Sequence, residues 1–169
     1  MRLGFSRVEN LDGGIEAWSL TVDGSGSMGA GYSGSGTMRI ADGKVVPSTD
    51  GILGFNSGSS GTATITGADS KWTIADDLTV GNAGEGRLNI TDDGTVEVTG
   101  DTRVAWATDS VGMIHFGDGM LTTGNLFSSF DDLSGTGIIN TRGLVSDVEL
   151  VFDSESSLTP SFSLNDDGQ

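Results

Sequence analysis

Residues 61–65 read Gly-Thr-Ala-Thr-Ile, and the same five-residue phrase recurs along the whole chain. Its counterparts are GTMRI from Gly36, GRLNI from Gly86, GMIHF from Gly112 and GIINT from Gly137. The five glycines lie 25, 25, 26 and 25 residues apart. A repeat of this length that also alternates like a strand is typical of a chain that stacks coils into a solenoid.

Within each phrase two apolar positions flank a polar one, which is the pattern of a strand with one buried face. In stacked coils a residue lies about 4.8 Å from its counterpart in the next coil, so each position becomes a ladder. The expected core ladder is Met38, Ile40, Ala63, Ile65, Leu88, Ile90, Ile114, Phe116 and Ile139. The expected surface ladder is Arg39, Thr64, Asn89, His115 and Asn140.

Each period divides into three short predicted strands, separated by Gly- and Asp-rich corners. The predicted strands are 36–41, 44–48 and 52–55, then 62–66, 71–74 and 78–80, then 87–91, 95–99 and 102–106, then 113–116, 120–122 and 126–130, with a last turn through 138–141 and 144–152. Three strands per coil imply three stacked parallel sheets. The sequence therefore predicts an all-β, right-handed parallel β-solenoid of about five to six coils, its hand following from the crossover rule.

The same pattern divides the chain into a long repeat region and two ends. Residues 28–152 are the predicted repeats, 1–27 an N-terminal cap or partial first coil, and 153–169 a C-terminal end or cap. The terminal coils of a solenoid need such caps, because one face of each has no neighbour.

The amino-acid composition excludes several classes of partner and binding site. Glycine makes up 28 of 169 residues, which suits many tight corners with positive φ. The net charge of −16 argues against nucleic acid as a partner, since phosphate binding needs clustered Lys and Arg. There is no cysteine, which excludes thiolate metal sites and disulfides, and no stretch is apolar enough for a transmembrane segment. We expect no cofactor.

The repeat unit resembles one family of bacterial repeats. The matching residues are 51–72, GILGFNSGSSGTATITGADSKW, followed by 77–90, DLTVGNAGEGRLNI. They resemble the repeat shared by autotransporter (type V secretion) passengers and proteins that carry a PEP-type C-terminal sorting signal. The resemblance is strong over residues 28–106 and weaker to 150. It implies a parallel β-solenoid and an extracellular or cell-surface location, but no catalytic residue. Residues 1–10 lack the apolar run of a signal peptide, so targeting signals would lie outside this chain.

Candidate catalytic and metal-binding residues are few. His115 is the only histidine and lies between two apolar residues, so we expect it on the surface ladder and not in a triad. Acidic pairs occur at residues 76–77, 92–93, 131–132 and 166–167, and a glycosidase uses two carboxylates. Aspartate also begins turns by binding nearby amides, and we favour that role. Weak cation binding at the corner aspartates stays open; these are Asp42, Asp69, Asp92 and Asp118.

The aromatic residues allow two interpretations. Trp72, Trp106, Phe55, Phe116, Phe127 and Phe130 could stack on sugars or pack in the core. Trp72 and Trp106 fall on different strands of the coil, so packing is the favoured interpretation.

The expected function is structural. The sequence favours a rigid spacer or adhesive segment of an exported bacterial surface protein, without catalysis. One alternative is a glycan-binding or glycan-cleaving β-helix of the polygalacturonase or lyase kind. A third is a fibre module that self-associates through open coil ends. The expected partners are accordingly a surface glycan or another solenoid subunit.

Overall fold

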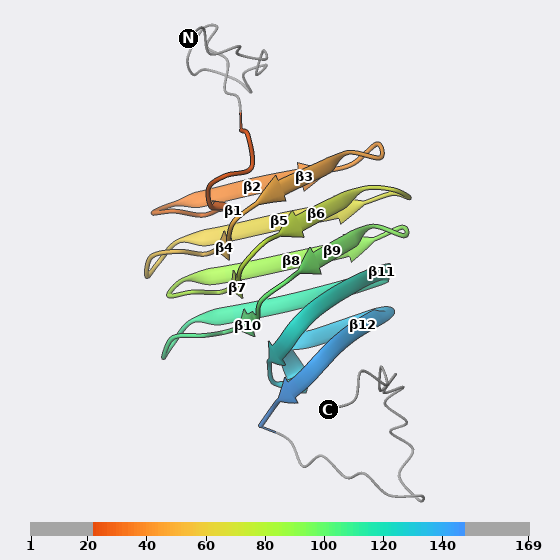
Figure 1. Ribbon diagram of the computed structural model, residues 1–169. Helices are drawn as coiled ribbons and strands as arrows, with labels where there is room; N and C mark the ends of the chain where they lie inside the picture. The colour runs from red at the N-terminus through yellow and green to blue at the C-terminus, as the bar shows by residue number, and fades with distance from the viewer. Residues whose placement is uncertain (1–21, 148–169) are drawn as a thin grey trace, which may run out of the picture.

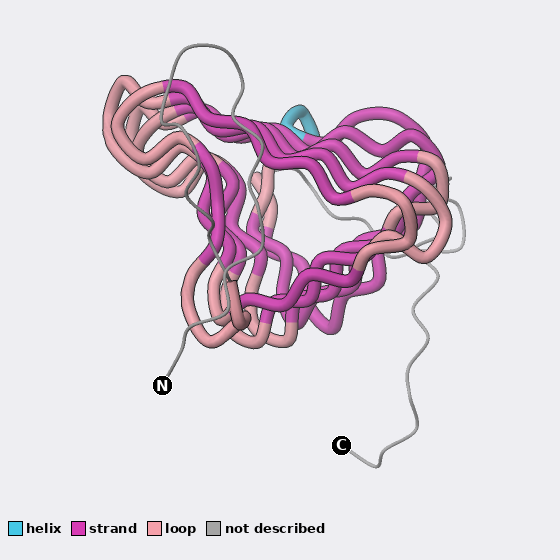
Figure 2. The backbone as a smooth tube through the Cα atoms, turned by 90° about the horizontal axis from the view of Figure 1, so that it is seen from above, coloured by secondary structure: helices cyan, strands magenta, loops and turns pink. Residues whose placement is uncertain are grey.

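The computed structural model describes residues 22–147, which form a parallel β-solenoid of about four turns (Figure 1). The first face stacks β2 (Ser35–Ile40), β5 (Ser60–Thr66) and β8 (Glu85–Thr91). The second stacks β3 (Val45–Ser48), β6 (Lys71–Ile74) and β9 (Thr95–Val98). The third stacks β1 (Met28–Ala30), β4 (Gly51–Leu53), β7 (Leu78–Val80) and β10 (Thr102–Val104). Viewed along the stack, the coils superimpose as a three-sided ring (Figure 2).

The last two strands of the described part of the chain are long. β11 (Val111–Phe127) and β12 (Leu133–Val145) each run through all three faces, and the short 3-10 helix η1 (Phe130–Asp132) connects them. The three separate strands expected at 113–116, 120–122 and 126–130 are therefore one bent strand. The corner after Phe116 consists only of Gly117-Asp118-Gly119. A β-bulge there bends the strand, and the pairing with the neighbouring coil continues on both sides of it.

The repeat register is confirmed through the first four phrases. Gly36 pairs with Gly61, Gly61 with Gly86, and Gly86 with Gly112. The ladder side chains behind them are buried; these are Ile40, Ala63, Ile65, Leu88, Ile90, Ile114 and Phe116. Met38 is half-buried and packs against this core from the first coil, where fewer neighbours cover it.

The fifth phrase does not continue the column. Gly137 pairs with Gly119 and Ile139 with Leu121, so both lie on the second face and not beside Gly112 and Ile114. The residue that stacks on Ile114 is Leu133, which follows it by 19 residues. The cause is a short corner at Ser128 to Asp132, which takes the place of the longer loop that precedes β11. Each residue of the last coil therefore reaches its face after fewer residues than in the coils before it. Ile139 is half-buried there and packs against the core.

The repeat glycines are required by a close approach between the two ends of each corner loop. A Cβ on Gly86 would lie 2.0 Å from the Gly81 backbone nitrogen, and one on Gly61 would lie 2.6 Å from that of Gly54. Neither glycine has a positive φ. The missing side chain, rather than backbone freedom, therefore explains the glycine that opens each of the first four phrases, whereas Gly137 lies against Gly119 and Phe116.

Residues 1–21 and 148–169 lie outside the described part of the chain. The N-terminal cap expected at 1–27 and the C-terminal end expected at 153–169 fall there almost entirely. Residues 28–30, where the predicted repeats begin, are described, and they form β1, which stacks on β4 in register.

Candidate functional site

The single histidine is on the surface. His115 is exposed, and its Nδ1 lies 3.1 Å from the Ser134 hydroxyl. It pairs with Asn89 in the preceding coil, as the surface ladder predicts, but with Ser134 in the next. Asn140 lies on the second face and pairs with Thr122, so its place in that ladder was wrong for the same reason as that of Gly137.

The four corner aspartates share a backbone conformation. Asp42, Asp69, Asp92 and Asp118 have φ values of 57°, 64°, 52° and 66°. This left-handed region is one that aspartate adopts more readily than most residues. Among residues 22–147, no three side chains of His, Asp or Glu gather as a metal site would require. Asp42, Asp69 and Asp92 lie in turns between strands, whereas Asp118 lies at the bulge within β11.

Asp92 also joins adjacent coils through its carboxylate. The Thr66 hydroxyl donates to Asp92 Oδ2 over 2.7 Å, and the Thr91 hydroxyl does so over 3.1 Å. Thr91 donates to Thr66 as well, over 2.9 Å. The Thr66 and Thr91 hydroxyls hold the pKa of Asp92 below its usual value of 3.8. The acid is thus part of a polar ladder that favours its ionised form.

The aromatic residues divide into core and surface groups. Trp72 is fully buried, and its indole Nε1 donates to the Ser48 hydroxyl over 3.0 Å. Phe116 is buried in the core ladder, so packing explains both residues. Trp106, by contrast, leaves 57% of its surface exposed.

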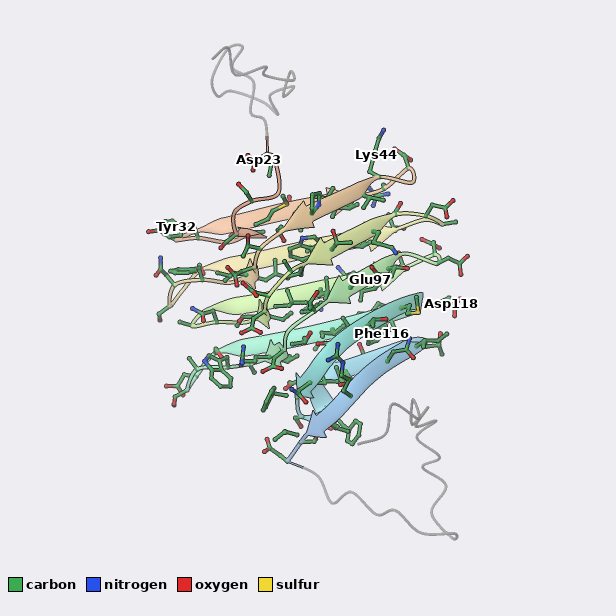
Figure 3. The ribbon with its side chains drawn as sticks, in the orientation of Figure 1. Asp23, Tyr32, Lys44, Glu97, Phe116 and Asp118 are labelled. Atoms are coloured by element: carbon green, nitrogen blue, oxygen red, sulfur yellow. The ribbon has the colours of Figure 1, made fainter. Side chains whose placement is uncertain are left out.

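Three exposed aromatic residues share one corner of the solenoid. The Phe55 amide donates to the Gly31 carbonyl, and the Trp106 amide to the Gly81 carbonyl. This pairing stacks Tyr32, Phe55, Asn82 and Trp106 one above another, and we call these four residues the aromatic column. The rings of Tyr32 and Phe55 have centroids 5.4 Å apart. Figure 3 shows Tyr32 projecting from the edge of the uppermost coil, away from the core.

A charged cluster supports the lower end of this column. Arg103 lies on β10 and contacts two carboxylates from successive coils, Asp77 over 2.6 Å and Asp101 over 2.8 Å. Asp101 also accepts a hydrogen bond from the Asn125 amide over 2.8 Å. The Arg103 guanidinium lies 5.0 Å from the centre of the Trp106 ring, within cation–π range.

The electrostatics of Asp77 follow from this cluster. Burial raises the pKa of Asp77, but the Asp101 amide and the Arg103 guanidinium outweigh burial. The net result is a pKa below 3.8. Asp77 is therefore ionised near neutral pH and acts as a partner of Arg103.

The pKa of Asp132, unlike that of Asp77, is raised above its usual value. Burial raises the pKa of Asp132 in η1, and the nearby carboxylates of Asp131 and Asp147 add to that effect. A pocket of about 230 Å³ opens beside η1 at the last coil. Its lining is mostly apolar and consists of Phe116, Phe130, Leu133, Ser134, Gly135, Gly137 and Ile139.

The aromatic column was missed from the sequence because its spacing is irregular. Its members are 23, 27 and 24 residues apart, whereas the repeat glycines keep nearly constant intervals. A usable signal does exist. Each member directly follows a residue of positive φ, which is Gly31, Gly54, Gly81 or Ala105. A search for the residue after each corner glycine would have found three of the four.

No family model, curated protein or solved structure matches this chain. Within residues 22–147 the structure also has no helix that is long and apolar enough to cross a membrane.

Proposed function

We propose that this chain is a rigid spacer segment of an exported bacterial surface protein, built as a right-handed stack of coils. The observation that carries the proposal is the register, which holds from Gly36 through Gly61 and Gly86 to Gly112 without a slip. A stack of this kind adds length in one direction, about 4.8 Å for each coil. Each coil contacts only its neighbours, so length can change while the cross-section stays constant.

Side-chain ladders support a stiff stack, because they join coils outside the core. Lys71 forms a 2.6 Å ion pair with Glu97 in the next coil, and Arg103 ties two coils through its carboxylate partners. Thr66 and Thr91 continue the same linkage on the first face. Ladders on separate faces resist bending in more than one direction.

The surface location rests on the resemblance of residues 51–72 and 77–90 to the autotransporter and PEP-sorting repeat. We propose membership of that family. The absence of cysteine is compatible with export, and the net charge of −16 favours solubility.

Labelling of intact cells tests the location. An antibody raised against residues 22–147 should label intact cells of the producing bacterium, and external protease should remove the label. Labelling only after lysis would contradict the surface location, while leaving the spacer geometry untouched.

The glycan-cleaving alternative has weaker support. Asp77 and Asp101 do converge from adjacent coils, but both bind Arg103, and the lowered pKa of Asp77 is opposite to what a general acid needs. Asp132, with its raised pKa, is the better-placed acid. We propose that the chain does not catalyse.

A screen of glycan hydrolysis and lyase activity, with calcium present, tests this. We expect no turnover by the wild-type chain. Turnover that disappears in Asp132→Asn would contradict a purely structural role.

A further inference from the structure

The aromatic column exposes large rings to solvent: Tyr32 is 72% exposed, Phe55 38% and Trp106 57%. None of the three residues belongs to the hydrophobic core or packs against it. We propose that the aromatic column is a binding site for an uncharged polysaccharide chain, which lies across successive coils along the solenoid axis.

The geometry of the column suits an extended glycan. Successive positions of a ladder are one strand spacing apart, so Tyr32 to Trp106 spans about 14 Å, the length of a few sugar units. Phe55 and Trp106 are two spacings apart, or about 10 Å, comparable to a disaccharide of an extended β-linked chain. Sugar rings expose apolar C–H faces, which pack on flat aromatic rings while the hydroxyl groups stay in contact with water or polar side chains.

Two asparagine side chains supply polar groups next to the rings. Asn56 Nδ2 donates to the Tyr32 carbonyl over 2.7 Å, and Asn82 Nδ2 donates to the Phe55 carbonyl over 2.9 Å. These bonds orient both side-chain amides. In the described part of the chain neither Oδ1 accepts a hydrogen bond from another residue, so each can accept one from a sugar hydroxyl.

Trp106 is held in place before any ligand arrives. Its ring packs edge-to-face with Phe127, with centroids 6.5 Å apart, and the Arg103 guanidinium lies against it. Arg103 is in turn fixed by Asp77 and Asp101. A ring that is already ordered loses little conformational entropy on binding, which favours affinity at an otherwise open surface.

The charge of the chain selects the class of glycan. The net charge of −16 repels acidic polysaccharides, and the carboxylates of Asp77 and Asp101 lie close to the lower end of the column. Arg103, the cation beside Trp106, is already bound by both carboxylates. An uncharged chain avoids this repulsion and uses the rings.

This binding function goes beyond the proposed spacer role. It can fail separately from that role, because the cell-labelling test of the proposed function uses no ligand. The probes are hydroxyethyl cellulose, xylan and galactomannan as uncharged polysaccharides, and polygalacturonate and alginate as acidic ones. In affinity electrophoresis, at least one uncharged polysaccharide should retard the full chain, and the acidic ones should not. The double variant Tyr32→Ala/Trp106→Ala should weaken retardation at least tenfold.

The matched control is Val45→Ala, which removes an exposed apolar side chain from another face. It should bind like the wild type. The column variants remove surface side chains, so unchanged circular dichroism and melting temperature will show that they still fold.

Three results would overturn the proposal: no retardation by any uncharged polysaccharide, retention of binding in the double variant, or retardation by the acidic polysaccharides alone. A fourth comes from light scattering. If the wild type is a dimer and the double variant a monomer, the column is an interface between two copies of the chain and not a glycan site.

Discussion

At the scale of single residues, the repeat depends on side chains that are absent as much as on those that are buried. Gly86 faces the backbone of its own corner loop, where a Cβ would approach the Gly81 nitrogen to 2.0 Å. The Gly81 nitrogen is a backbone atom, so it cannot move aside without shifting the coil.

Gly86→Ala should therefore destabilise the fold by about 2–3 kcal/mol or more, as overpacking does. Gly34→Ala is the control, because a Cβ there meets nothing within 4 Å and the φ of Gly34 is not positive. That change should stay within about 0.5 kcal/mol. Urea unfolding monitored by circular dichroism measures both. Equal effects of the two substitutions would argue that the close approach does not exist.

The alternation of buried and polar positions makes a second prediction. Leu88 is fully buried, whereas Asn89 is half-buried and donates only a 3.3 Å hydrogen bond to Thr64. Leu88→Ala should cost about 2–5 kcal/mol of unfolding free energy through lost contacts and a cavity. Asn89→Ala should cost about 1 kcal/mol or less. A larger loss for Asn89 than for Leu88 would mean that the register is shifted by one residue.

At the scale of strands and corners, the sequence predicts most where the corners have similar lengths. The strands of the middle coils, β5 to β10, lie within a few residues of the expected ranges, because alternation marks them and Gly or Asp ends them. The prediction fails at β11 and β12, where corner length changes. Corner length decides which face a residue reaches, and apolar alternation alone does not encode it. This is why Ile139 looked like a counterpart of Ile114.

The candidate site shows the same limitation. Corner residues were expected to be turn formers, and Asp92 fulfils that role. The aromatic column depends on how loops of unequal length superimpose across coils, which requires the stacked geometry. Phe55 and Trp106 were both considered from the sequence, but their place in one column with Tyr32 and Asn82 became visible only through the shared backbone pairing.

The Arg103 cluster predicts a pH-dependent effect on stability. The folded-state pKa of Asp77 lies below 3.8, so its stabilising contribution is present above that pH and is lost as pH falls through the folded value. Arg103→Met removes the guanidinium and leaves the Asp77 and Asp101 carboxylates facing each other. The variant should melt below the wild type at pH 7.

The difference in melting temperature between the two proteins should shrink as pH falls through the folded-state pKa of Asp77, which lies below 3.8, because protonated Asp77 no longer attracts the guanidinium. Calorimetry at several pH values measures it. A difference that is constant with pH would assign the role of Arg103 to its packing against Trp106 and Phe127.

At the scale of the whole molecule, the central claim is that this chain builds length one coil at a time. Because Gly61 and Gly86 occupy equivalent positions, residues 62–86 form one complete coil that can be repeated without disturbing the register. Four additional copies inserted after Gly86 add 100 residues to the chain. Small-angle X-ray scattering should then show the dimension along the stack increased by about 19 Å, or four strand spacings, with an unchanged cross-sectional radius of gyration. A broader cross-section, with little gain in length, would contradict the stacked-coil account.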